Sequence, residues 1–96
     1  MTKIIVQKFG GTSVGSVERI DAVADIIADA SKTAKIVVVV SAMAGETNKL
    51  VNLAKNFSEN PDKREFDALV STGETVSSAL LSLALHSKGC LLYTSD

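Results

Sequence analysis

Near its start the chain reads Ile4-Ile5-Val6-Gln7-Lys8-Phe9-Gly10-Gly11-Thr12-Ser13-Val14-Gly15, an apolar run that meets a glycine pair and two hydroxyls. The apolar half is typical of a β-strand, and the residues from Ser16 onward are typical of a helix. A turn of this kind aims backbone N–H groups and a helix N-terminus at one small volume, where a phosphate group binds well. The stretch therefore points to phosphoryl transfer as a reaction class.

A second apolar run, Ile36-Val37-Val38-Val39-Val40, predicts a strand that helices cover on both faces. Between the two runs, apolar residues recur at helical spacing and predict a helix from about Ser16 to Lys32. Strand, helix and strand form a βαβ unit, for which a parallel, right-handed arrangement is expected. The first forty residues therefore predict an α/β fold.

The remainder of the chain predicts further helices. One runs from Thr47 to about Ser58, and Pro61 separates it from a short helix that ends near Gly73. The hydroxyl-rich segment 71–75 is interpreted as a break. A last helix, from Thr75 to Lys88, is apolar over most of its surface, so it should be deeply buried in a complete domain. An isolated short chain should expose part of it.

The composition argues against several kinds of partner and site. The formal net charge is −1 over 96 residues, so no basic surface is predicted for nucleic acid or an anionic membrane. The longest strongly apolar run, 36–40, is too short to span a bilayer. The single Cys90 cannot form an internal disulfide and fits a reducing compartment. We therefore expect a cytoplasmic protein without nucleic-acid or membrane partners.

Two common phosphate-binding motifs do not fit the glycine turn. A Walker A loop requires lysine where Ser16 stands, and the Rossmann fingerprint does not match glycines at positions 10, 11 and 15. Lys8 instead precedes the glycines and can offset the negative charge of a transferring phosphoryl group. The alternative is a surface lysine beside an ordinary turn. The glycine pattern alone leaves these two interpretations about even.

Polar residues in two later segments are candidates for substrate binding. Ser41 and Thr47 follow the second strand, whose carboxyl end should open on the same sheet edge as the first. Thr47 also suits a helix N-cap, which is the commoner role. Glu74 suits either the start of a helix, where its charge complements the dipole, or the ammonium group of a substrate. No histidine or cysteine spacing predicts a metal site.

Three segments in this order resemble the aspartate kinases of the amino acid kinase family: Lys8-Phe9-Gly10-Gly11-Thr12-Ser13-Val14, Val39-Val40-Ser41-Ala42-Met43 and Ser71-Thr72-Gly73-Glu74. The resemblance runs to about Gly89. It implies a three-layer α/β/α sandwich with a mostly parallel sheet, of which only the N-terminal part is present. Residues 1–89 would be the N-terminal part of the catalytic domain, and the 90–96 tail departs from the family's pattern, as a non-native ending would.

The resemblance also implies ATP-dependent phosphorylation of the side-chain carboxylate of L-aspartate to 4-phospho-L-aspartate, with Mg²⁺ accompanying ATP. This reaction leads to lysine, threonine, methionine and diaminopimelate. Lys8 would be catalytic. Contacts with ATP and its phosphates are implied for Lys8, Phe9, Gly10, Gly11, Thr12 and Ser13, and contacts with aspartate for Ser41, Thr47 and Glu74. The full-length protein would be a homo-oligomer, whereas this short chain alone is expected to be inactive.

Two alternatives stay open at this point. The chain could belong to another amino acid kinase that acts on a different carboxylate, such as glutamate, acetylglutamate or carbamate. It could also be a non-catalytic module that binds phosphate or an amino acid.

Overall fold

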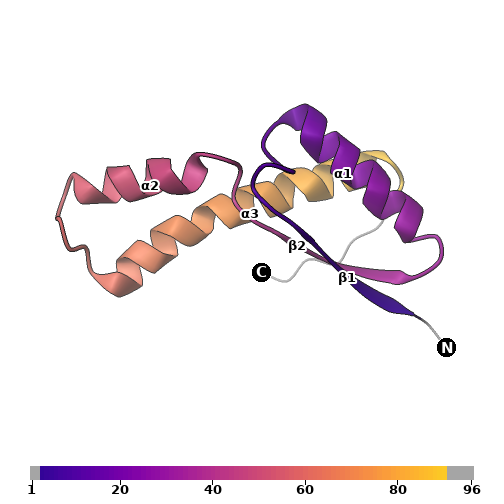
Figure 1. Ribbon diagram of the computed structural model, residues 1–96, viewed down its shortest axis with the longest axis horizontal. Coiled ribbons are helices and arrows are strands. Elements are labelled where there is room, and N and C mark those ends of the chain that lie inside the picture. Colours follow the sequence, from indigo (N-terminus) through magenta and orange to yellow (C-terminus); the bar gives the residue numbers. More distant parts are fainter. Residues whose placement is uncertain (1–2, 91–96) are drawn as a thin grey trace.

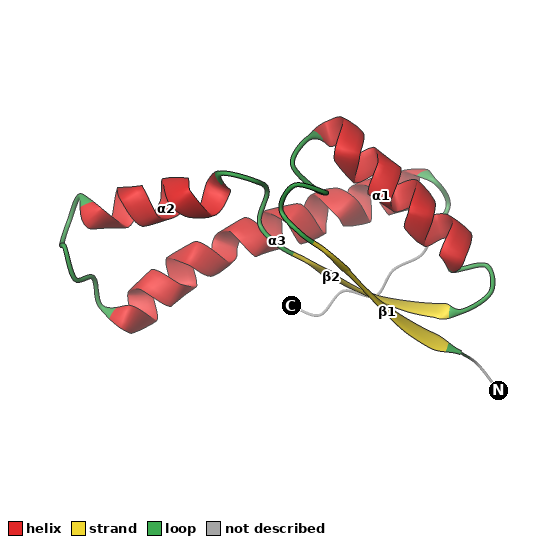
Figure 2. Cartoon of the chain, in the orientation of Figure 1, coloured by secondary structure: helices red, strands yellow, loops and turns green. Residues whose placement is uncertain are grey.

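A two-stranded parallel sheet organises the computed structural model, which describes residues 3–90. The strands are β1 (Ile4–Phe9) and β2 (Lys35–Val40), and the helices are α1 (Val17–Ala30), α2 (Glu46–Lys55) and α3 (Lys63–Ser87). Helix α1 connects the two strands, while α2 and α3 follow them (Figures 1 and 2). The α/β class and the parallel pairing expected from the sequence are confirmed.

Helix α1 begins and packs as its sequence predicts. Ser16 is the N-cap, and its side chain accepts a hydrogen bond from the backbone N–H of Arg19 at 3.2 Å. The buried residues recur at the spacing of one helix face and are Ile20, Val23, Ala24 and Ile27. This face joins Leu81 and Leu85 of α3 in the main hydrophobic core.

The core lies on one face of the sheet only. Alternate residues of β2, namely Ile36, Val38 and Val40, are half-buried and pack against the core. Residues on the opposite face are largely exposed, with 65% of Val6 and 50% of Val37 accessible to solvent. The expectation that helices cover both faces of β2 is therefore wrong for residues 3–90. These residues form two of the three layers that the family resemblance implies.

Helix α3 is continuous through the segment predicted as a break. The hydroxyls of Ser71, Thr72 and Thr75 donate to backbone carbonyls three or four residues earlier in the helix, at 2.6 to 3.4 Å. These bonds satisfy the hydroxyls inside the helix, so they need no turn or cap. Gly73 lies mid-helix despite its low helix propensity. The two helices predicted on either side of Gly73 are one helix.

Helix α3 has two environments along its length. Its C-terminal half packs beside α1, whereas its N-terminal half and α2 extend away from the sheet as a helical hairpin (Figure 1). Phe57, at the connection between the two helices, is 93% exposed. Val76, Leu80 and Leu83 of α3 are also exposed. The helix predicted to be deeply buried is buried along one stripe, and the rest of its apolar surface is open in this chain.

Among the described residues, α3 is also the one helix whose length and composition would let it cross a membrane. Polar residues interrupt the apolar sequence of α3, so this helix contains no long unbroken apolar run. A long core helix passes the same test. Leu81 and Leu85 pack against α1, while most of the apolar window of the helix is exposed within residues 3–90.

A surface ion-pair fork ties the end of α3 to α1. The Nζ atom of Lys88 lies 2.9 Å from Asp25 and 3.0 Å from Asp21. Hydrogen bonds to Asp25 and then to Asp21 raise the pKa of Lys88 above its ordinary value of 10.5. Because the pKa of Lys88 is higher in the folded state than in the unfolded state, protonated Lys88 stabilises the fold. This stabilisation is complete at pH values below the unfolded-state pKa, and it is lost as the pH rises through the folded-state pKa.

We therefore expect the urea midpoint of the chain to fall above about pH 10.5, and the fall to be smaller in Lys88→Met. Chemical denaturation monitored by circular dichroism across pH 8 to 12 measures the difference. Lys32→Met is the matched control, because Lys32 makes only an exposed pair with Asp29 at 3.7 Å. Parallel curves for the native chain and Lys88→Met would contradict the role of the fork.

Candidate functional site

The two strand-to-helix turns meet at the carboxyl edge of the sheet. Phe9 and Val40 are register partners at the ends of their strands. The backbone N–H of Ser41 donates to the carbonyl of Phe9 at 3.1 Å, and that of Ala44 donates to the carbonyl of Gly11 at 3.1 Å. The prediction that both turns open on one edge is confirmed, and backbone hydrogen bonds hold them together.

Gly11 is required at the contact between the turns. A methyl group added at Gly11 would lie 2.8 Å from the carbonyl oxygen of Ala42 and 3.4 Å from the nitrogen of Ala44. Such a distance to a backbone oxygen is a steric clash that neither turn can relieve by rotating a side chain. Gly10, by contrast, has open space where its Cβ would be. The two glycines therefore differ in role: Gly11 allows the two turns to pack closely, and Gly10 leaves open space beside the first turn.

The segment 71–74, in the middle of α3, contacts the second turn through Gly73. A methyl group added at Gly73 would lie 2.9 Å from Cβ of Ala42 and 3.6 Å from a methyl of Leu50. The middle of α3 therefore packs directly against the second turn. Residues 8–14, 39–43 and 71–74, which are distant in sequence, converge around Ala42. Ala42 itself is buried, at 8% exposed.

The first turn presents its polar groups outward and anchors its apolar ones. Val14 is fully buried, and the Phe9 side chain packs against the core, so Phe9 offers a ligand only its backbone. Lys8 lies on the exposed face of β1, one residue before the strand ends. Gly10 and Thr12 are exposed, and Ser13 is half-buried. Lys8 and the turn are accessible from the same edge of the sheet.

The residues predicted to bind the amino-acid substrate lie in different elements. Ser41 directly follows β2, Thr47 lies in the first turn of α2, and Glu74 lies on the exposed surface of α3. Within residues 3–90 none of their side chains makes a hydrogen bond or ion pair with the protein, whereas the hydroxyls beside Glu74 are satisfied within the helix. Ser41 and Glu74 adjoin the Ala42–Gly73 contact, and their polar groups are available to a ligand.

Two alternative structural roles for these residues are wrong. The N-cap of α2 is Gly45, whose φ of 86° lies in the left-handed region that favours glycine, so Thr47 is not the cap. Glu74 lies in the interior of α3 and not in its first turn, and the influence of the helix dipole is confined to the terminal turns. Neither residue is explained by capping or by the dipole.

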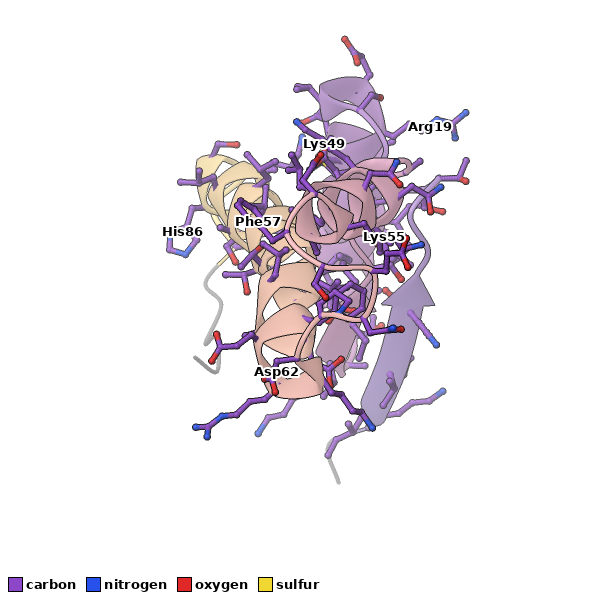
Figure 3. All side chains as sticks on the ribbon, turned by 90° about the vertical axis from the view of Figure 1, so that its left-hand side faces the viewer. Arg19, Lys49, Lys55, Phe57, Asp62 and His86 are labelled. Atoms are coloured by element: carbon purple, nitrogen blue, oxygen red, sulfur yellow. The ribbon has the colours of Figure 1, made fainter. Side chains whose placement is uncertain are left out.

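Other features of the described residues do not belong to this site. An open depression of about 460 Å³ on α2 is lined by Gly45, Asn48, Lys49, Asn52, Leu53 and Asn56, none of which was predicted to bind a ligand. Figure 3 labels Lys49 among them and shows His86 pointing away from the ribbon. No group of three or more His, Cys, Asp or Glu side chains within residues 3–90 could hold a metal ion.

Sequence inspection missed Ala42 and the contact role of Gly73. Ala42 lies between two segments that carry chemically distinctive residues, and an alanine gives no chemical signal of its own. The only available clue was that small residues occur in all three segments. The sequence shows which residues are small, but not that they touch.

Comparison with known proteins identifies the family of the chain. The model of the amino acid kinase family matches residues 3–96. Aspartokinase from Geobacillus stearothermophilus is 62% identical over 87 residues, which cover 90% of this chain and 21% of that protein. Aspartokinase 2 from Bacillus subtilis is 58% identical over the same length, with the same coverage.

A solved structure shows the same fold. The crystal structure of aspartate kinase from Synechocystis superposes with a TM-score of 0.87 and 59% sequence identity, covering 88% of this chain and 15% of that one. The chain thus spans about a fifth of the length of the curated relatives named above. Residues 91–96, which make up most of the 90–96 tail predicted to depart from the family's pattern, lie outside the described residues. From its match over residues 3–96 and from this likeness in structure, the chain belongs to the amino acid kinase family.

Proposed function

We propose that this chain forms the N-terminal part of an aspartate kinase active site, which transfers the γ-phosphoryl group of ATP to the side-chain carboxylate of L-aspartate. The convergence of three segments around Ala42 carries this proposal. The first turn with Lys8, which would face the phosphates, lies on one side of this contact, together with Ser41, whose backbone is hydrogen-bonded to Phe9. Glu74, which suits the ammonium group of an amino acid, lies on α3 on the other side.

The chemistry of this reaction suits the residues present. The acceptor carboxylate is ionised at neutral pH and needs no general base. One of its oxygens attacks the γ-phosphorus, the bond from phosphorus to the bridging oxygen of ADP breaks, and ADP leaves with that electron pair. The protein must hold two anions close together, so a cation and backbone N–H donors near the phosphoryl group supply much of the stabilisation.

Each side of the site has a distinct task in this scheme. Lys8 and the backbone of Gly10 and Gly11 would face the phosphates, with Thr12 and Ser13 beside them. Glu74 would pair with the ammonium group of aspartate, while Ser41 and Thr47 donate hydroxyl hydrogen bonds to its oxygens. The described residues offer no carboxylate cluster for Mg²⁺, so we assign the ion to the phosphates of ATP, where it commonly binds.

The wider setting is part of the same proposal. The product, 4-phospho-L-aspartate, would enter the biosynthesis of lysine, threonine, methionine and diaminopimelate in the cytoplasm. The complete enzyme would be a homo-oligomer. The 96-residue chain by itself should show no turnover, because it spans about a fifth of its relatives.

A chimeric enzyme tests the proposal. The 87 matched residues of this chain replace their counterparts in Geobacillus stearothermophilus aspartokinase, with which they are 62% identical. We expect ATP-dependent formation of aspartyl hydroxamate, with aspartate preferred over glutamate, acetylglutamate and carbamate. An inactive chimera that is folded by circular dichroism, or one that prefers another acceptor, would count against aspartate as the substrate.

A second arm of this experiment tests the acceptor side. Glu74→Gln removes the charge that would pair with the substrate ammonium group, so the KM for aspartate should rise about tenfold or more, while that for ATP changes little. Glu65→Gln, an exposed glutamate in the first turn of the same helix, is the matched control and should leave both constants near their starting values. An equal effect of the two substitutions would remove Glu74 from the site.

A further inference from the structure

Ala42 is held between two close contacts of different kinds. On one side the carbonyl oxygen of Ala42 faces Gly11, where an added methyl group would clash with backbone at 2.8 Å. On the other side the Ala42 side chain faces Gly73, where an added methyl group would lie 2.9 Å from Cβ. One buried alanine therefore separates the phosphate-binding turn from the middle of α3.

We propose that Gly73 is a positioning residue, which sets the distance between the acceptor side of the site and the phosphate side through its contact with Ala42. This inference rests on the proposed function. Glu74, next to Gly73, moves with α3, while Lys8 and Gly10 are fixed to the sheet and the first turn. The contact between Gly73 and Ala42 therefore sets the distance between Glu74, which would hold the aspartate, and the first turn, which would hold the phosphates.

The second turn cannot yield to a side chain at position 73. Its backbone is hydrogen-bonded to the first turn on both sides of Ala42, through the N–H groups of Ser41 and Ala44. Leu50 of α2 also lies 3.6 Å from the position of the added methyl. A methyl at Gly73 therefore displaces α3, and Glu74 with it, away from the phosphate-binding turn.

Catalysis and stability should respond differently to this displacement. Alanine has a higher helix propensity than glycine, which favours the substituted helix and offsets part of the strain. Turnover has no such compensation, because a misplacement of about 1 Å between reacting groups can lower a rate about a hundredfold. A positioning role thus predicts a larger loss in kcat than in folding.

The experiment uses the chimeric enzyme with Gly73→Ala, with Ala42→Gly and with both substitutions. Gly73→Ala should lower kcat at least tenfold, and the double variant should recover to within about threefold of the parent, because Ala42→Gly removes the methyl group that clashes. Gly11→Ala provides the contrast: its clash is with the backbone oxygen of Ala42, so adding Ala42→Gly should not rescue it. Thermal unfolding midpoints are recorded for every variant.

Each outcome bears on the inference or on the proposed function. Turnover by Gly73→Ala within threefold of an active parent overturns the positioning role and leaves the proposed function in place. Failure of Ala42→Gly to restore kcat to folded Gly73→Ala also overturns the positioning role. An insoluble Gly73→Ala variant that Ala42→Gly makes soluble and active supports it. A folded but inactive parent overturns the proposed function, and the positioning role falls with it.

Discussion

In the chimeric enzyme, Lys8→Ala is expected to lower kcat about 10²- to 10³-fold, which corresponds to about 3 to 4 kcal/mol of lost transition-state stabilisation. Lys8 lies on the exposed face of β1, one residue before the turn that holds Gly10 and Gly11. Without its charge, the repulsion between the γ-phosphoryl group and the aspartate carboxylate would be offset only by backbone dipoles and by the Mg²⁺ that we assign to the phosphates of ATP. Aspartyl hydroxamate formation under saturating substrates measures the effect.

Lys35→Ala is the matched control for this substitution. Lys35 is an exposed lysine of the same sheet, but it begins β2 and pairs with Ile4 at the opposite edge. Its removal should leave kcat within about twofold. Lys8→Arg should recover part of the rate, because it keeps the charge but changes its shape. Equal losses in Lys8→Ala and Lys35→Ala would show that general surface charge, and not a phosphate contact, is responsible.

Leu85→Ala is expected to destabilise the chain by about 2 to 5 kcal/mol, since it leaves a cavity at a fully buried position. Leu85 joins α3 to α1 in the main core, which is small and lies on one face of a two-stranded sheet. A loss of this size is a large part of the stability of a small domain. Urea denaturation of the 96-residue chain should show a strong fall in the midpoint or no cooperative transition.

Leu83→Ala provides the same chemical change on the same helix. Leu83 is 68% exposed, so its truncation removes little packing and should cost less than about 1 kcal/mol. Similar midpoints for the two variants would mean that α3 does not pack on α1 through the stripe that includes Leu81 and Leu85.

Much of the fold could be predicted because its signals are local. The strands Ile4–Phe9 and Lys35–Val40 each contain a short continuous apolar run, and the helix that follows Ser16 repeats apolar residues at helical spacing. The N-cap at Ser16 adds a local hydrogen bond to that pattern. The shared sheet edge followed from the parallel topology, and Lys8 and Ser41 both lie at the strand ends of that edge.

Two of the errors concern where a helix breaks and where a helix begins. Ser71, Thr72 and Gly73 together suggest a break, because each disfavours a helix interior in isolation. In the structure the two hydroxyls bond back to helix carbonyls, and Gly73 gains close packing against Ala42, so the helix continues. The N-cap of α2 is Gly45 and not the predicted Thr47, because the chain leaves the second turn through a residue in the left-handed region.

What the amino-acid order alone establishes is both strands, the first helix, the three polar segments and the family they resemble. Each of these depends on residue types and spacings that are read along the chain. The meeting of Gly11, Ala42 and Gly73 is a different kind of fact, because residues far apart in sequence pack so closely that a methyl group on either glycine would clash with Ala42. Such an approach depends on the position of α3 over the sheet edge, which long-range packing determines and no local pattern records.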